Sequence, residues 1–352
     1  MKYYMGMDHG TTAISFEIID ENKEEVSYFK LNRDKLSKKE IFFKDIINDK
    51  IDIKKVKLLA MTYAMGDGIS KITPIDLVKD RGIQSINGAG KVTGGGTTVY
   101  EDIMELNIPS VLIPGLHSGC EFLDDRFRAS YSHCGSPEKV SLSYYAYLKT
   151  GFKNMIIADI SSNTVCILVE DGKIKGAMDA CVGAMGFIHG PLDLDMIRDI
   201  DSGKKTANEA FSHAGISKIA CVDSQINNVK DDILEKALHN DKKGLLAIRS
   251  LVMSVIMEIY GLYGIMENKI DGIVLTGSGG CMTSPINISG MIKEKIERQK
   301  KMLDEYLTNL KKNLNEVYVL GSDSGAIGSS YIAYDIEKNK VDKIMGIDVI
   351  YE

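Results

Sequence analysis

The chain has 352 residues, of which 44% are hydrophobic and 26% charged, a composition typical of globular proteins that excludes disordered, collagen-like and coiled-coil classes. At about 150 residues per domain, this length predicts about two domains, large enough together to fold without disulfides or a structural metal. A net charge of −6, from 43 basic and 49 acidic residues, argues against general binding to nucleic acid or to anionic membranes.

The N-terminal segment reaches Asp8 and His9 before any apolar run long enough for a signal peptide. The six cysteines lie far apart without a Cys-x-x-Cys pair, which is typical of reduced thiols. The most apolar segment, residues 245–266, contains Arg249 and Glu258, both costly in lipid. We therefore expect a cytoplasmic protein without a membrane span.

Two apolar runs, residues 3–7 and 13–19, flank the polar sequence Asp8-His9-Gly10-Thr11-Thr12 and predict two strands around a tight turn. Further along, residues 36–48 have helical spacing and residues 57–64 read as a buried strand. Residues 82–98 form a predicted loop rich in glycine.

A helix is predicted from Ser136-Pro137-Glu138 to Leu148. Serine suits the N-cap, proline the first helical position and an acid the first turn, and Gly151 lies just past the expected end.

The strand–turn–strand pattern recurs at residues 154–169, where two apolar runs flank Asp159 and the turn Ser161 to Thr164. Asp171 follows Asp159 by the same 12 positions that separate Asp20 from Asp8, and the two copies are offset by 151 residues. A repeat at this distance is too long for a solenoid unit and predicts two related domains. The expected boundaries are 1–150, 151–324 and 325–352.

In the second half, residues 245–266 predict a largely buried helix, followed by an apolar strand at 272–275. That strand runs into the sequence Thr276-Gly277-Ser278-Gly279-Gly280, and a glycine cluster at the carboxyl end of a buried strand is a common ligand position. Residues 291–315 are amphipathic, with lysines expected on a solvated face, and 316–320 predict a strand. Residues 325–334 predict a helix of small residues that crosses back to the first domain.

Asp8 and Asp159 each end a predicted strand just before a turn of small polar residues. Backbone N–H groups and hydroxyls of Gly10, Thr11 and Thr12 can meet phosphate oxygens, and either aspartate can hold Mg²⁺ through water. The same donors recur in the second turn, at Ser161, Ser162, Asn163 and Thr164. A single turn of this kind occurs in many hairpins, but the duplication and the later glycine cluster favour an ATP site.

These three motifs resemble the phosphate-1, phosphate-2 and adenosine motifs of the actin, Hsp70 and sugar-kinase superfamily. The resemblance is closest to the acetate and butyrate kinase branch, and more narrowly to the methanogenesis marker protein 12 family of methanogenic archaea. It extends through residues 124–128, 190–198 and 317–321. It implies two duplicated RNase H-like domains of α/β class, with ATP and Mg²⁺ in the cleft between them and closure coupled to nucleotide state.

Resemblance to the acyl-phosphate kinases also implies catalytic roles for Asp8, Asp125, Arg126 and Asp159, with Asp125 as a metal or phosphoryl-site acid. Arg126 or Arg128 would neutralise the moving phosphoryl group. The alternative is that residues 124–128 only solvate a surface loop. Arg198 is similarly open to two readings, a functional cation or a structural ion pair.

The sequence departs from those kinases in two places. Ser161, Ser162 and Asn163 occupy a turn that is rich in glycine there, so the backbone approaches phosphate less freely. Asp323 is the nearest substitute for the acid at the start of the last helix. Both departures argue against efficient acyl-kinase turnover but leave nucleotide binding intact.

Several other features have two interpretations. Residues 88–96 resemble a P-loop but lack its first glycine and its Ser/Thr after the lysine, so a mobile loop over a substrate or a plain connection is expected. His9 is either near the γ-phosphate or an exposed turn residue. The segment with His117, Cys120, His133 and Cys134 offers zinc-like ligands, but adjacent residues point apart, so His117 and Cys120 more simply line a wall.

The sequence therefore predicts an ATP- and Mg²⁺-dependent phosphotransferase acting on a small acid. The alternative is a slow ATPase that acts as a nucleotide-switched assembly or activation factor for a protein client, in keeping with the resemblance to a methanogenesis family. A third possibility is a module that binds nucleotide without chemistry. Nucleotide is the expected ligand, a small carboxylate or a client protein the expected partner, and oligomers are compatible with the sequence.

Overall fold

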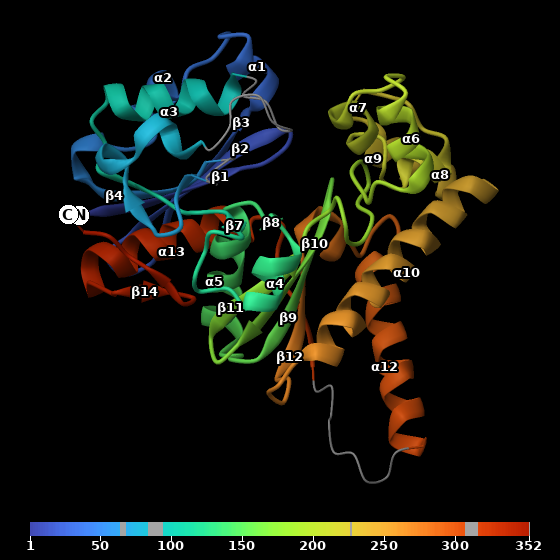
Figure 1. Cartoon of the computed structure of the whole chain (residues 1–352). Coiled ribbons are helices and arrows are strands. Elements are labelled where there is room, and N and C mark those ends of the chain that lie inside the picture. Colours follow the sequence, from blue (N-terminus) through green and yellow to red (C-terminus); the bar gives the residue numbers. More distant parts are fainter. Residues whose placement is uncertain (64–67, 84–93, 226, 307–315, 352) are drawn as a thin grey trace. The chain divides into compact units, whose positions relative to one another are not determined.

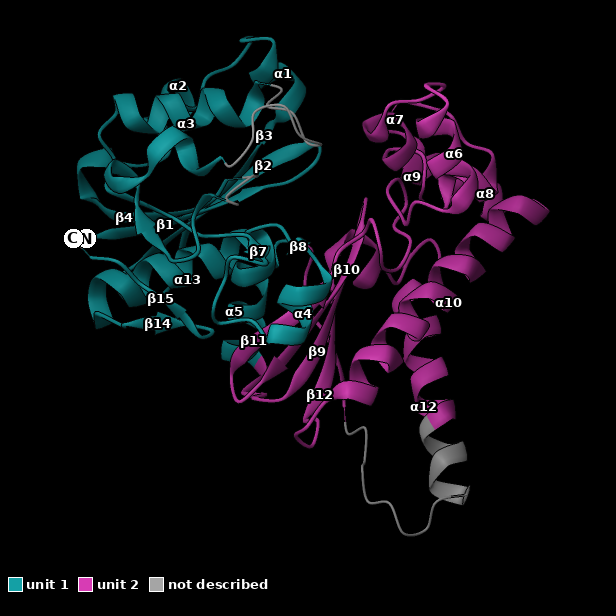
Figure 2. Ribbon diagram, viewed as in Figure 1, with its two compact units in different colours: residues 1–149, 323–352 teal, residues 150–322 magenta. Residues whose placement is uncertain are grey.

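The computed structural model describes all residues except 64–67, 84–93, 226, 307–315 and 352, and the side chains of 300–306 are also left aside. The chain divides into two compact units (Figure 2). Unit 1 contains Met1–Lys149 and Asp323–Glu352, and unit 2 contains Thr150–Ser322. Unit 2 is therefore one continuous segment, whereas unit 1 is built from both ends of the chain.

Unit 1 is built on a six-stranded sheet with the strand order β3-β2-β1-β4-β6-β5. Strand β2 pairs antiparallel with β1 and β3, whereas β4 runs parallel to both β1 and β6. The strands are β1 (Tyr3–His9), β2 (Ala13–Asp20), β3 (Glu25–Asn32), β4 (Val56–Thr62), β5 (Thr73–Pro74) and β6 (Ser110–Leu112). The predicted strands at 3–7 and 13–19 are confirmed, and that at 57–64 corresponds to β4, its last residue lying outside the described residues.

Helices cover both faces of this sheet (Figure 1). On one face α1, α2 and α3 bury Leu36, Phe43 and Val99 in a core with Phe16 and Met61 from the strands. The helices of unit 1 are α1 (Arg33–Ser37), α2 (Phe43–Ile47), α3 (Gly95–Glu105), α4 (Asp125–Ser130), α5 (Glu138–Thr150) and α13 (Ser324–Asn339). Short pieces complete it: β7 (Leu116–His117), β8 (His133–Gly135), β14 (Lys343–Ile344), β15 (Ile347–Asp348) and the 3₁₀ turns Ile53–Lys55, Ile75–Leu77 and Lys79–Gly82.

Two sequence predictions in unit 1 were wrong in part. Residues 36–48 form the end of α1 and the separate helix α2, because Lys39 adopts φ 58° and breaks the helical path. The expected loop at 82–98 ends earlier, since α3 already begins at Gly95. Of the P-loop-like segment 88–96, residues 88–93 lie outside the described residues.

Helix α13 packs on β1 at backbone distance. A Cβ on Gly6 would collide with the carbonyl oxygen of Ala326 and the amide nitrogen of Ser330, and a Cβ on Gly328 would collide with the carbonyl of Ser141 in α5. The Ser329 hydroxyl lies 2.9 Å from the Ser141 hydroxyl in the same contact. The small residues of the predicted last helix therefore serve close packing within unit 1.

Unit 2 has a five-stranded sheet with the order β11-β10-β9-β12-β13. Strand β10 is antiparallel to β9 and β11, whereas β12 is parallel to β9 and β13. The strands are β9 (Met155–Ile160), β10 (Thr164–Glu170), β11 (Lys173–Met178), β12 (Gly272–Thr276) and β13 (Val317–Val319). This is the order and direction of β3-β2-β1-β4-β6 in unit 1, so the internal repeat predicted from the two turns is confirmed.

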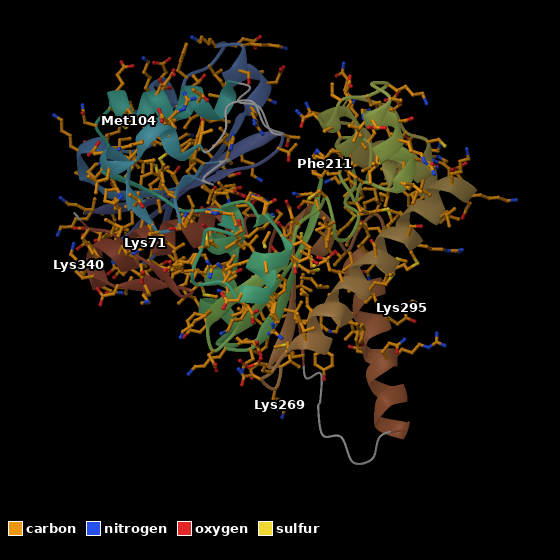
Figure 3. The ribbon with its side chains drawn as sticks, in the orientation of Figure 1. Lys71, Met104, Phe211, Lys269, Lys295 and Lys340 are labelled. Carbon is orange, nitrogen blue, oxygen red and sulfur yellow. The ribbon has the colours of Figure 1, made fainter. Side chains whose placement is uncertain are left out.

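The helices of unit 2 include a group between β11 and α10, α6–α9, of which α7–α9 match no predicted element. They are α6 (Leu194–Asp201), α7 (Ala207–Phe211), α8 (Ser217–Ala220), α9 (Val229–Leu238), α10 (Lys242–Ile265), α11 (Gly277–Gly280) and α12 (Ile288–Tyr306). On α12, Lys295 projects into solvent, as expected of its lysine-rich face (Figure 3).

Within the described residues, α10 is the one helix that length and composition would allow to cross a membrane. Its inner face is packed into unit 2, with Leu251, Val255 and Ile259 fully or nearly fully buried. The same face carries the buried carboxylate of Glu258. These features make α10 a core helix of unit 2.

The glycine contacts under α13 lead to a test of unit 1. We expect Gly6→Ala to lower the free energy of unfolding by about 3 kcal/mol, because its methyl group would meet rigid backbone rather than a side chain that can move. Gly321→Ala is the matched control, since a Cβ there has nothing within 4 Å. Urea unfolding followed by circular dichroism measures both, and equal stability of the two variants would contradict this account of the packing.

Candidate functional site

Asp8 lies near the carboxyl end of β1, beside Thr62 at the end of the parallel strand β4. The Thr62 hydroxyl is 3.4 Å from Oδ1 of Asp8 and accepts the backbone N–H of His9 at 3.1 Å. The other carboxylate oxygen, Oδ2, lies against Gly325 of α13. Only glycine fits at position 325, because a Cβ there would be 2.6 Å from this oxygen. Asp8 is thus fixed by two parallel strands and one helix.

His9 is enclosed rather than exposed. Its ring stacks on Tyr63 with centroids 6.0 Å apart, and a Cβ on Gly96 would collide with the imidazole. Burial of the ring, with the positive charge of Arg33 nearby, lowers the pKa of His9 to about 3. His9 is therefore neutral at physiological pH, and the exposed-turn reading of this residue is wrong.

Arg33 lies beside the first turn, although it belongs to none of the predicted motifs. Its backbone N–H donates to Thr12 O at 3.0 Å, and its guanidinium Nη1 lies 3.4 Å from Gly10 O. Burial lowers the pKa of this half-buried guanidinium below its ordinary value. Among the described residues no carboxylate lies within ion-pair distance of it, so a desolvated positive charge stands at the turn.

In unit 2, Asp159 and the glycine cluster lie at the carboxyl ends of the adjacent parallel strands β9 and β12, where Thr276 is paired with Asp159. The Ser161 hydroxyl links them, since it donates to Asp159 Oδ1 at 3.4 Å and accepts the Ser278 N–H at 3.1 Å. Gly277 has φ +81°, and a Cβ there would collide with the Asp159 carboxylate. The structure thus brings the second predicted turn and the glycine cluster together.

A neighbouring loop holds the turn from Ser161 to Thr164. The backbone N–H of Phe187 donates to Ser161 O, and those of Ile188 and His189 donate to Ser162 O, at 2.9–3.1 Å. Inside the turn, the Ser161 N–H donates to Asn163 O, and the buried Thr164 hydroxyl donates to Met185 O. Two of the predicted phosphate donors are therefore already engaged within unit 2.

The buried carboxylate of Glu258 in α10 fixes that neighbouring loop. It accepts the backbone N–H of Cys166 at 3.0 Å and also that of Ala184. Burial raises the pKa of Glu258 to about 7, although both hydrogen bonds oppose the shift. Glu258 is therefore one titrating group that connects α10 to β10 and to the loop that supports the second turn.

Asp125 and Arg126 lie on the surface helix α4 of unit 1. The Asp125 side chain is 92% exposed and pairs with Arg128 at 2.9 Å, while Arg126 pairs with the N-cap residue Asp124 at 2.7 Å. Their catalytic roles stay predictions. In unit 2, the exposed Arg198 pairs with Asp195 at 3.2 Å, which agrees with the structural reading of that residue.

Asp323 precedes α13, at the position where the sequence places a substitute acid. Its carboxylate does not cap the helix, but accepts the Tyr28 hydroxyl at 2.7 Å and the Lys30 ammonium at 2.8 Å from strand β3. Both partners lie in unit 1 with Asp323. The carboxylate is therefore held against the sheet by two donors.

His117 is a structural residue of unit 1. Its Nδ1 accepts the Gly119 N–H at 3.1 Å, so Nε2 carries the proton and donates to Ile69 O at 2.8 Å. Cys120 and Cys134 are buried. In the described part of the chain, no three His, Cys, Asp or Glu side chains are grouped to hold a metal ion, which leaves the zinc-like arrangement without support.

Known structures share this fold over nearly the whole chain. A propionate kinase from Francisella tularensis subsp. tularensis superposes with a TM-score of 0.65 at 14% identity, covering 94% of this chain and 98% of its own. The acetate kinase of Entamoeba histolytica gives 0.64 at 13% identity, covering 96% and 100%. The mixed α/β class predicted from the sequence is confirmed, and the fold is the actin-like ATPase fold of the acetate and propionate kinases.

Sequence relatives define the family. Proteins called UPF0285 from Methanothermobacter thermautotrophicus and Methanocaldococcus jannaschii are 49% and 47% identical to this chain, covering 98% and 99% of both partners. The chain belongs to the UPF0285 family. No family model matches it.

The pKa of Glu258 predicts how the stability of the protein depends on pH. Because the folded-state pKa is raised from 4.5 to about 7, the folded state binds the proton more tightly, and stability falls as the pH rises through this window. Between pH 4.5 and about pH 7 the wild type should lose about 3 kcal/mol of its free energy of unfolding through this group, and Glu258→Gln should remove that loss. Urea unfolding of wild type and variant across this pH range measures the difference, and parallel profiles would show that Glu258 does not titrate there.

Proposed function

We propose that the chain binds ATP with Mg²⁺ and transfers or hydrolyses the γ-phosphoryl group. In unit 1, Asp8, the turn Gly10–Thr12 and Arg33 would meet phosphate and metal. In unit 2, Asp159, the turn Ser161–Thr164 and the glycine cluster Gly277–Gly280 would hold the rest of the nucleotide. The fold supports a phosphoryl-transfer function, since the structures that share it include a propionate kinase and an acetate kinase.

The half-buried guanidinium of Arg33 is the observation that carries the proposal. The described residues supply no carboxylate partner for this desolvated cation, and such a charge is unfavourable unless an anion binds there. It lies beside the turn whose backbone and hydroxyls were predicted to meet phosphate, and Nη1 is 3.4 Å from the turn carbonyl of Gly10. Phosphate suits a guanidinium well, because two N–H groups of the planar fork can donate in parallel to two oxygens of the same phosphate group.

Mg²⁺ would be held by Asp8 and Asp159 through water, as expected of a small hard cation that keeps several waters. The metal would neutralise charge on the β- and γ-phosphates. Asp8 is oriented for this by Thr62, and Asp159 by Ser161. Each aspartate supplies the carboxylate oxygens that a hydrated magnesium ion prefers.

A small carboxylic acid is the acceptor that we propose, on the basis of the resemblance to acetate and butyrate kinases. Arg126 or Arg128 and Asp125 would serve the transfer. The surface ion pairs of these side chains would then have to open when substrate binds.

We expect Arg33→Gln to weaken binding of Mg-ATP by about tenfold or more, because a charge-assisted hydrogen bond to phosphate is lost. The same change should leave the protein equally or more stable, since it removes a desolvated charge. Isothermal titration calorimetry and thermal unfolding measure the two effects. Lys38→Gln is the control, because Lys38 is exposed and already paired with Asp34; equal affinities of the two variants would remove the role of Arg33.

Asp159→Asn should abolish ADP release in the presence of Mg-ATP and a panel of short carboxylates, while an excess of chelator should do the same to the wild type. Asp125→Asn tests the exposed acid separately. Acyl phosphate trapped as hydroxamate identifies the acceptor. If no carboxylate raised ADP release above the level of Asp159→Asn, the kinase activity would be refuted.

The state of the second turn favours a second candidate, a slow ATPase that switches an assembly or activation factor. The Ser161 N–H and the Thr164 hydroxyl are bonded inside unit 2, and Asp323 is bound to Lys30 and Tyr28, so fewer groups are poised for fast transfer. The family resemblance suggests a client among the enzymes of methanogenesis. Affinity capture with ATP, with ADP and without nucleotide tests this, and an identical set of captured proteins would exclude the switch.

A further inference from the structure

The outer face of α10 is an exposed apolar ridge that no described part of unit 2 covers. Met253 is 56% exposed and Met257 66% exposed, which is unusual for large apolar side chains in the middle of a helix. Leu246 and Ile265 extend the exposure towards both ends, at 54% and 41%. The opposite face of α10 is packed against the sheet and helices of unit 2.

Two exposed glycines of α10 are not required by any contact among the described residues. Gly261 and Gly264 lie in the helix, where glycine is less favourable than alanine. A Cβ at either position would have nothing within 4 Å, and neither residue has a positive φ. Glycine here is explained if another backbone approaches the ridge closely, as small residues permit at helix–helix contacts.

The ridge has the symmetry that a pair of identical helices requires. Arg249, Met253, Met257, Gly261 and Ile265 are all exposed and follow one another at intervals of four, which forms one row of side chains along the helix. In an antiparallel pair centred on Met257, Met253 of each copy lies opposite Gly261 of the other. The large Met253 side chain of each copy thus meets the glycine of the other, and the two-fold axis produces this contact twice from the same two residues.

The charges fit the same arrangement. Centred on Met257, the exposed Arg249 lies opposite Ile265, the last residue of α10 in the other copy. A cation at a helix C-terminus interacts favourably with the negative end of the helix dipole. Antiparallel packing also places the two helix dipoles in opposite directions.

We propose that a second copy of this chain docks on the outer face of α10, forming a two-fold dimer centred on Met257. The partner is a copy of the same chain because both pairings, Met253 with Gly261 and Arg249 with the C-terminus of α10, are symmetric about Met257. An exposed apolar face of this length on a monomer would otherwise favour uncontrolled association.

Sedimentation velocity over a wide range of concentrations tests the dimer. We expect the wild type to sediment as a dimer and Met257→Glu to raise the dissociation constant by about a hundredfold or more, since two like charges would meet at the axis. Met104→Glu is the matched control, an exposed methionine on α3 of unit 1 (Figure 3), and it should remain dimeric. Far-UV circular dichroism checks that both variants are folded.

Cross-linking tests the position of the axis. Under mild oxidation Met257→Cys should form a disulfide-linked dimer well beyond the level of the wild type, which has an exposed Cys221 of its own. Leu246→Cys, on the same face but far from the axis, should not. A monomeric wild type, unchanged association of Met257→Glu, or equal cross-linking of the two cysteine variants would each overturn the proposal.

Discussion

The backbone contact between α13 and β1 is the constraint on which unit 1 depends. Helix and strand touch where Gly6 faces Ala326 and Ser330, so neither element can move away or accept a side chain without losing the contact. The same helix presents Gly325 to the carboxylate of Asp8. Close packing therefore does two things at once, because it joins the last helix to the first strand and fixes the acid at the end of that strand.

In unit 2 the corresponding acid, Asp159, is also held at the end of a strand. Its sheet repeats the strand order of unit 1, and the ends of two parallel strands again lie side by side, a position where α/β proteins commonly bind ligands. Here the Ser161 hydroxyl bridges Asp159 and the Ser278 amide, and Gly277 of α11 lies against the Asp159 carboxylate. Glu258 supports that turn from behind through the loop at 184–189. In each half a hydroxyl group and a helix glycine therefore lie at the aspartate, Thr62 and Gly325 at Asp8 and Ser161 and Gly277 at Asp159.

Much of the fold followed from the sequence because its signals are local. The apolar runs around Asp8 and Asp159 and the spacing between them predict the duplicated sheets, and the caps at Ser136 and Gly151 predict α5. The break at Lys39 and the start of α3 at Gly95 depend on backbone conformations that periodicity does not report. Helices α7–α9 are short and have mixed polarity, so no single window identified them.

The candidate site was predicted only where its residues belong to a recognisable turn. Arg33 and Glu258 reach their sites through the pairing of β2 with β3 and the packing of α10, contacts between residues distant in sequence. The chain order has a consequence for synthesis. Unit 2 is one uninterrupted segment and has all its strands once Ser322 has been made, whereas the first sheet lacks α13 until residues 324–339 follow. Although domains generally fold in order from the N-terminus, the unit that begins first here is completed last, and β1 must wait with its Gly6 face uncovered while the whole of unit 2 is translated.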